Sequence, residues 1–150
     1  MFNPEKDTAG FAFVLYRCAI AFRNELNRAF YKEYGEDLTA DYWFILSALW
    51  EEDNLSHTIL TERVSRDKAS LSRTLDLMEQ KGLIKRIAVE NDKRGSKIVL
   101  TPKSHDLRNK TTEIATNFSQ KELKGLSPIE VKELVRMINQ VFMNIKSEQC

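Results

Sequence analysis

Apolar residues recur with helical spacing through the middle of the chain. Between residues 68 and 81, Leu71, Leu75 and Met78 follow one another at intervals of four and three, so they share one face of a predicted helix and pack inward. At about 100° per residue, a set of small and polar residues points the opposite way. That set is Ala69, Ser72, Arg73 and Asp76. One arginine among small, hydrogen-bonding side chains suits insertion into the major groove of DNA.

A shorter amphipathic helix precedes this one. It is predicted to begin at Ser56, with Ile59, Leu60 and Val64 facing inward. Residues 65–67 make a tight connection, in which Asp67 is a good N-cap for the second helix, and the following glycine at position 82 marks that helix's end. Two helices joined by so short a turn predict a helix-turn-helix.

Beyond position 82 the hydrophobic period changes from 3.6 to 2. Strands are predicted at 84–89 and 97–100, and the residues between them have turn chemistry at Asn91, Asp92 and Gly95. The pattern therefore predicts a β-hairpin with a basic tip. Such a hairpin beyond a helix-turn-helix is a wing, able to reach backbone phosphates and a neighbouring minor groove.

Apolar helices are predicted on both sides of this segment. Residues 11–34 are apolar around most of the helix up to Phe22, so that helix must be covered on nearly all sides. Thr101 and Pro102 fit the N-cap and first position of a later helix, and a capping box at 127–130 opens the last one. The last helix has a heptad-like seam that needs a partner helix, formed by Val131, Leu134, Val135, Ile138, Val141, Phe142 and Ile145. We expect the two ends of the chain to form the dimerisation unit of a homodimer.

Together these elements predict a mainly α fold with a small β-hairpin wing. Thr39 can cap a short, buried helix that opens the central segment. We expect one domain, residues 1–150, in which a winged helix-turn-helix of about residues 38–101 is inserted between dimerisation helices of about 8–35 and 102–147. The segment 38–101 is called the head below.

The charge distribution changes this picture more than the net charge of +1 does. Residues 56–100 hold ten Lys or Arg against six acidic residues, whereas residues 1–55 hold five against ten. A basic segment on an acidic frame suits a polyanion held at one face. By charge alone, an ordinary surface of mixed charge is an equally good interpretation.

Other function classes find little support in the sequence. Cys18 and Cys150 lie far apart with no metal-ligand spacing, so we expect reduced thiols, no metal and no cofactor. No apolar run is long enough for a membrane span and the first ten residues are too polar for a signal peptide, so we expect a cytoplasmic protein without a membrane partner. His57 and His105 lack the neighbours of a catalytic site. We expect both to be surface residues of a protein that is not an enzyme.

Across essentially its whole length the chain resembles the MarR family of bacterial regulators. The most specific stretches are SLSRTLDLMEQKGLIKR and NDKRGSKIVLTPKS, which match the family's recognition helix, the turn after it, the wing tip and the closing Leu-Thr. The matching residues are Gly82, Leu83, Ile84, Arg86, Asp92, Arg94, Leu100 and Thr101. Thr61 and Ser104 depart from the usual Ala and Gly. We expect the Thr61 hydroxyl to bond back to a carbonyl in the preceding turn.

The resemblance implies a sequence-specific transcriptional regulator, a ligand-responsive repressor that binds a pseudopalindromic operator in double-stranded DNA as a homodimer. The candidate DNA-binding residues are Lys68, Ser70, Ser72, Arg73, Arg86, Asp92, Lys93, Arg94 and Lys97. Arg73 is the first candidate for reading guanine, its alternative being a phosphate-bound or solvated arginine. Arg94 is expected in the minor groove. Asp92 either orients Arg94 or Arg86 or simply forms the turn.

Control of DNA binding leaves several alternatives. By resemblance, Tyr16, Arg17 and Trp43 form an apolar slot with one cation for a small aromatic or phenolic effector, although a Trp and a Tyr there also suit the core. Some relatives sense peroxides through a first-helix cysteine, a role for which Cys18 is the candidate, but a cysteine within an apolar stripe also behaves as a small hydrophobe. A third alternative is a dimeric protein-interaction module that does not bind DNA.

Overall fold

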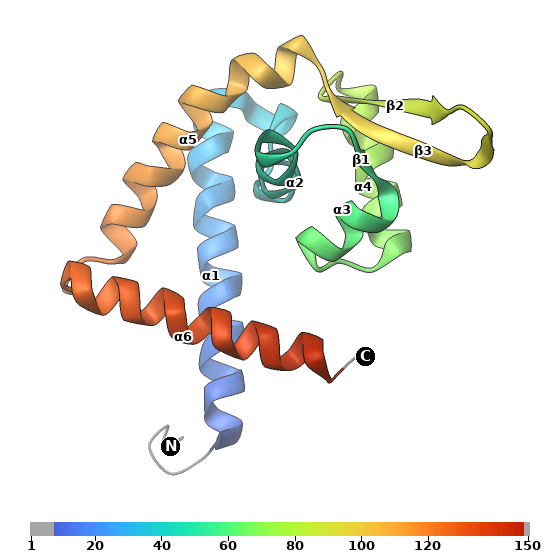
Figure 1. Ribbon diagram of the computed structural model, residues 1–150. Coiled ribbons are helices and arrows are strands. Elements are labelled where there is room, and N and C mark those ends of the chain that lie inside the picture. Colours follow the sequence, from blue (N-terminus) through green and yellow to red (C-terminus); the bar gives the residue numbers. More distant parts are fainter. Residues whose placement is uncertain (1–7, 149–150) are drawn as a thin grey trace. The chain divides into compact units, whose positions relative to one another are not determined.

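The computed structural model describes residues 8–148, except for the side chains of residues 8, 9 and 92–94. The elements are α1 (Thr8–Tyr34), the 3-10 turn η1 (Gly35–Asp37), α2 (Ala40–Glu51), β1 (Leu55–Ser56), α3 (His57–Val64), α4 (Lys68–Gln80), β2 (Ile84–Val89), β3 (Asp92–Leu100), α5 (Pro102–Glu122) and α6 (Pro128–Ser147). The predicted class, mainly helical with a small β wing, is confirmed (Figure 1).

The chain divides into two compact units between Ala115 and Thr116, within α5. The first unit holds α1, the head and the start of α5, and the second holds the rest of α5 with α6. The expectation that the whole chain acts as one domain stays a prediction. None of the helices in the described part of the chain is long and apolar enough to cross a membrane.

The core of the head is the one that the apolar spacing predicts. Leu71, Leu75 and Met78 of α4 are fully buried, and so is Leu60 of α3. Ile59, however, is 44% exposed, so the prediction that it faces inward is wrong. The α3 helix is only eight residues long, and its packing against α2, α4 and the sheet buries only the stripe around Leu60.

The sheet has three antiparallel strands in the order β1-β3-β2. β2 coincides with the first predicted strand, but β3 begins at Asp92, because only residues 90 and 91 form the turn and Asn91 takes a left-handed conformation with φ 69°. The register runs from Ile84 opposite Leu100 to Ala88 opposite Ser96, and then shifts at Val89. The predicted seven-residue tip is thus a short turn followed by an irregular, bulged start of β3.

β1 is an element that the sequence pattern did not predict. Leu55 and Ser56 pair with Ile98 and Lys97 of β3. This pairing ties the entry of α3 to the base of the wing, so the helix-turn-helix and the hairpin share one sheet (Figure 1).

Buried hydroxyl groups fix the exit from the wing. The Thr101 hydroxyl donates to the Gly82 carbonyl at 2.6 Å, and the Ser104 hydroxyl both accepts from the Thr101 N–H and donates to the Thr101 carbonyl at 2.9 Å. Thr101 and Ser104 are 5% and 0% exposed. Serine at position 104 therefore supplies hydrogen bonds that glycine cannot, and the start of α5 is joined to the end of α4.

The apolar surfaces predicted for dimerisation are exposed within one chain. On α1, Phe11, Phe13 and Val14 are about half exposed, and only Leu26 and Phe30 of its apolar stripe are buried. The predicted capping box of α6 is present, formed by Ser127 and Glu130. No residue of α6 is buried. Both helices thus present apolar side chains that their own units leave uncovered.

Candidate nucleic-acid interface

The turn between α3 and α4 has the geometry of a helix-turn-helix. Ser65 ends α3 in a left-handed conformation, with φ 51°, and the Asp67 carboxylate caps α4 by accepting from the Ser70 N–H at 2.8 Å. The Thr61 hydroxyl donates to the His57 carbonyl at 2.8 Å, which confirms the expected bond to the preceding turn. The left-handed residue that ends α3 and the side-chain cap that begins α4 therefore set the direction of the turn.

Helix α4 presents two cations that have no charged partner among the residues that the structure describes. Lys68 and Arg73 are exposed, and neither has an ion pair or side-chain hydrogen bond with the residues that the structure describes. Arg73 lies about 200° around the helix from the buried Leu71. This position suits a residue that contacts a ligand outside the protein.

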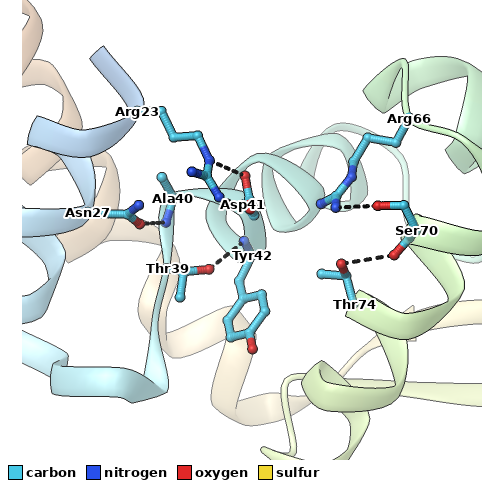
Figure 2. Close-up of polar contacts among 9 residues, drawn as sticks. All are labelled: Arg23, Asn27, Thr39, Ala40, Asp41, Tyr42, Arg66, Ser70 and Thr74. Atoms are coloured by element: carbon cyan, nitrogen blue, oxygen red, sulfur yellow. Dashed lines mark hydrogen bonds and ion pairs between the residues drawn. The ribbon is translucent and has the colours of Figure 1, made fainter. Parts of the chain in front are cut away.

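Ser70 lies three residues before Arg73, about 60° around the helix from it, but its polar groups are engaged within the head. Its hydroxyl accepts from Arg66 Nη2 at 2.8 Å, and its carbonyl accepts from the Thr74 hydroxyl at 3.1 Å (Figure 2). Ser70 and Ser72 are both half-buried, whereas Arg73 is exposed. The hydrogen bond from Arg66 gives the Ser70 hydroxyl a partner inside the head.

Arg66 is a residue that the sequence analysis missed. It lies in the turn, four residues before Ser70, and its Nη1 atom is buried without a hydrogen-bond partner among the described residues. Its positive charge also reaches Asp41 of α2. The spacing of four residues was the available signal, but it became informative only with the turn geometry known.

Asp41 joins the head to α1. Arg23 of α1 donates to both Asp41 carboxylate oxygens, at 3.0 and 2.6 Å, and the Asn27 side chain accepts from the Ala40 N–H at 2.7 Å (Figure 2). The hydrogen bonds from Arg23 hold the pKa of Asp41 below its ordinary value, against the opposing effect of burial. Charges of Arg23 and Arg66 act in the same direction as the hydrogen bonds.

Arg86, a candidate DNA contact, is held within the protein. Its guanidinium contacts Asp76 at 2.7 Å and Glu79 at 3.2 Å, and donates to the Ser72 carbonyl at 3.3 Å. Its backbone N–H also donates to Glu79 at 2.9 Å. These contacts link β2 to α4 and compensate the positive charge. Arg86 is therefore placed to position the wing against the recognition helix.

A cavity of about 650 Å³ opens between the start of α3, the start of α4 and the wing. It is lined by Ser56, His57, Thr58, Lys68, Ala69, Ser72, Arg86, Gly95 and Ser96. Three candidate DNA-binding residues meet here: Lys68, Ser72 and Arg86. His57 is half-buried, so it is not the simple surface residue that the sequence suggested. Burial, and then the charges of Lys68 and Arg86, lower the pKa of His57.

The wing candidates are described unevenly. Lys97 is half-buried in β3, opposite Ile87 of β2 and Ser56 of β1. The backbones of Asp92, Lys93 and Arg94 belong to β3, but their side chains lie outside the described part of the structure. The minor-groove role of Arg94 and the orienting role of Asp92 stay predictions.

The three effector candidates are not brought together within one chain. Trp43 packs against Phe30, with tilted rings whose centroids are 5.8 Å apart, and donates from Nε1 to the Thr111 hydroxyl at 3.1 Å. Tyr16 is 66% exposed, and Arg17 lies over the Phe13 ring. Thirteen residues of helix separate Arg17 from Phe30, roughly 20 Å at 1.5 Å per residue. A slot shared by these three residues would need a second chain.

Cys18 is a free and exposed cysteine in the single chain. The expectation that it packs as a small hydrophobe is therefore not met within one chain. Cys18 is exposed because its own unit does not cover the first half of α1. Cys150 lies outside the described residues.

These features define the class of the protein. A short helix, a tight turn, a second helix with an outward cationic face and an antiparallel hairpin behind it form a winged helix-turn-helix. Residues 38–96 match the model of the MarR family. The match covers the head, which is thus similar to the MarR family of transcriptional regulators.

Solved structures share the fold over most of the chain. Transcriptional regulator PA3341 is 27% identical, with a TM-score of 0.75 over 91% of this chain and 98% of its own. Reduced AbfR bound to DNA is 21% identical, with a TM-score of 0.70 over 90% and 91%. PcaV from Streptomyces coelicolor, in complex with its natural ligand, is 19% identical, with a TM-score of 0.76 over 94% and 95%.

Proposed function

We propose that this protein is a transcriptional regulator that binds double-stranded DNA as a homodimer, with one α4 in each of two major grooves. The observation that carries the proposal is the outward face of α4, where Arg73 and Lys68 are exposed and unpaired among the described residues. Unpaired cations on a protruding helix suit phosphates and guanine edges. The fold shared with DNA-bound AbfR supports the same arrangement.

Arg73 and Arg86 have different roles in this proposal. Arg73 has no internal partner in the described structure and is free to form a bidentate contact with guanine. Arg86 is engaged with two carboxylates and a carbonyl, so it acts through the position of the wing. Lys68 contacts a phosphate, and Ser72 faces the cavity between α4 and the wing. The DNA contacts of the wing come from Lys93, Arg94 and Lys97.

The homodimer is proposed from the uncovered apolar helices. A seam such as that of α6, without one buried residue, matches the a and d positions of a helix that packs against another helix. Two heads held by one dimer then bind a site with two-fold symmetry, and the linkage multiplies their affinity.

The experiment is selection of bound duplexes from a random pool, followed by titration with the selected and an unrelated duplex. Arg73→Ala should weaken binding of the selected duplex by roughly 10- to 100-fold, the equivalent of about 1 to 3 kcal/mol, and change the unrelated duplex much less. Arg28→Ala, which removes an exposed arginine of α1, is the control. Equal losses on both duplexes would reassign Arg73 to a phosphate.

We further propose repression that a small aromatic or phenolic ligand relieves. PcaV, of the same fold, is described with its natural ligand. The geometry of Tyr16, Arg17 and Trp43 requires any slot that they share to lie between two chains. Titration with salicylate-type anions, read out by thermal stability and by affinity for the selected duplex, tests this; no change in either would remove the slot.

The exposure of Cys18 favours a second candidate, regulation by oxidation. In that reaction a peroxide oxidises the thiolate to a sulfenic acid and is reduced to water or an alcohol. Affinity for the selected duplex should change after peroxide treatment, and Cys18→Ser should be insensitive. Unchanged affinity of the oxidised wild type would eliminate this candidate.

A further inference from the structure

Two cations line the cavity between α3, α4 and the wing: Arg86, which is paired with carboxylates, and Lys68, which is not paired among the described residues. Arg86 is engaged by Asp76 and Glu79, at 2.7 and 3.2 Å. Lys68 has no ion pair within the described residues. The Lys68 ammonium, unpaired among the described residues, thus lines a space of about 650 Å³ between α4 and the wing.

His57 lines the same cavity, and its contacts identify where it can take up a proton. The Thr61 hydroxyl gives its only proton to the His57 carbonyl, at 2.8 Å. The same oxygen lies 3.3 Å from His57 Nδ1, so it can only accept there, and Nδ1 carries the hydrogen of the neutral ring. Nε2 then holds the lone pair, and no described residue bonds to it. Protonation at Nε2 would create a second uncompensated cation at the cavity.

We propose that this cavity binds a phosphate of the DNA backbone and that His57 takes up a proton at Nε2 when the phosphate enters. The inference rests on the proposed function, since it assigns one contact of the DNA complex to a residue outside the recognition helix. A phosphate between Lys68 and the imidazolium would accept charge-assisted hydrogen bonds from both.

The groups facing His57 set the direction of the linkage. Lys68 comes from α4 and Arg86 from β2, with Arg86 paired to Asp76 and Glu79. Among the described side chains, the other lining residues, from β1, α3, α4 and β3, are uncharged, and Lys97 is the strand partner of Ser56. In the free protein, burial and the two cations lower the pKa of His57 from its ordinary value. A bound phosphate reverses that effect and raises the pKa. DNA affinity should therefore fall as pH rises between the lower, free pKa and the higher, bound pKa.

The chain has two histidines, which provides a matched control. Affinity for the selected duplex should be measured from about pH 5.5 to about pH 8 at constant salt, a range that brackets the ordinary histidine pKa. The affinity of wild type and of His105→Gln for the selected duplex should fall in parallel as pH rises. The fall should be about tenfold for each unit by which bound DNA raises the pKa of His57. His57→Gln should lose this dependence. A dependence that persists in His57→Gln, or a flat wild-type profile, overturns the inference.

A second measurement needs no DNA. The imidazole resonances of the free protein are titrated by NMR with and without sulfate as a phosphate-like probe. Sulfate should raise the pKa of His57; the resonances of His105, exposed on α5, serve as the reference. Lys68→Gln should raise the pKa of His57 without sulfate, because a repulsive charge is gone, and should weaken the response to sulfate. A His57 pKa that ignores sulfate overturns the phosphate site.

The two measurements distinguish the two proposals. If the wild type binds duplex DNA but His57 titrates identically in the free and bound states, only the phosphate contact fails. If no duplex binds at any pH, the proposed function fails, and the DNA contact of His57 fails with it. Circular dichroism of each variant checks that the head is folded.

Discussion

Helices α4 and α6 have apolar stripes of similar regularity and opposite burial. In α4, Leu71, Leu75 and Met78 are 0% exposed, because the helix packs against α3 and β2. In α6, no residue is buried and Ile138 is 42% exposed. A periodic stripe therefore identifies an amphipathic helix without identifying what covers it. For α4 the cover is the head itself, and for α6 we propose that it is a second copy of the chain.

The largest effect is expected where the head covers its own core. Leu75→Ala should lower the free energy of unfolding by about 2 to 5 kcal/mol, because a fully buried side chain leaves a cavity. Urea unfolding followed by circular dichroism measures the change. A loss below about 1 kcal/mol would mean that the head core can collapse around the gap.

A substitution in the apolar stripe of α6 should affect dimerisation rather than the stability of the fold. Ile138→Asp should leave the helical content unchanged but dissociate the proposed dimer. Because the two heads are then separate, affinity for the selected duplex should fall by about 100-fold, equivalent to about 2.7 kcal/mol. Sedimentation velocity and duplex titration measure the two effects. Asn139→Asp, an exposed position one residue further round the helix, is the control. A dimeric Ile138→Asp would show that the interface lies elsewhere.

The hydrogen bonds of the Thr101 hydroxyl join the end of α4 to the start of α5, and their contribution to stability can be measured. Thr101→Val should cost about 1 to 3 kcal/mol of unfolding free energy, because it leaves the Gly82 carbonyl and the Ser104 N–H without the buried hydroxyl. Thr112→Val, at an exposed position of α5, should change stability little. Equal values for the two variants would remove the hydroxyl's structural role.

The smallest change in the free energy of unfolding is expected for the ion pair between Arg23 and Asp41, which joins α1 to the head. Asp41→Asn should cost on the order of 1 kcal/mol or less at neutral pH, since Arg23 is partly exposed and screened by solvent. The pKa of Asp41 is lowered in the folded state, so its stabilisation is present above the unfolded value and disappears as pH falls through the folded value. The difference between variant and wild type should therefore vanish in strong acid. A difference in stability that persists in strong acid would contradict this role of the Asp41 carboxylate.

Local chemistry made much of the fold predictable. The caps at Thr39, Asp67 and Ser127 each use a side chain to satisfy a helix N–H, so they can be found in the sequence and are present in the structure. The buried face of α4 was predictable for a similar reason, because its spacing is regular. These features depend on neighbours within four residues.

Features that depend on distant neighbours were missed. β1 is two residues long and carries no periodicity, so only its pairing with β3 reveals it. Arg86 was predicted as a DNA contact without the partners that hold it, since Asp76 and Glu79 approach it only when β2 folds back on α4. His57 lines a cavity built from three elements, which no single stretch of sequence describes.

The Arg86 contacts also have a mechanical consequence. Because one guanidinium contacts Asp76, Glu79 and the Ser72 carbonyl, we expect the recognition helix and the wing of one head to move together. In the proposed complex, the length of duplex that one head covers is then constant. If the protein is the proposed dimer, we expect operators with differently spaced half-sites to be accommodated by rotation of one protomer against the other, so that the dimer contacts set the spacing tolerance.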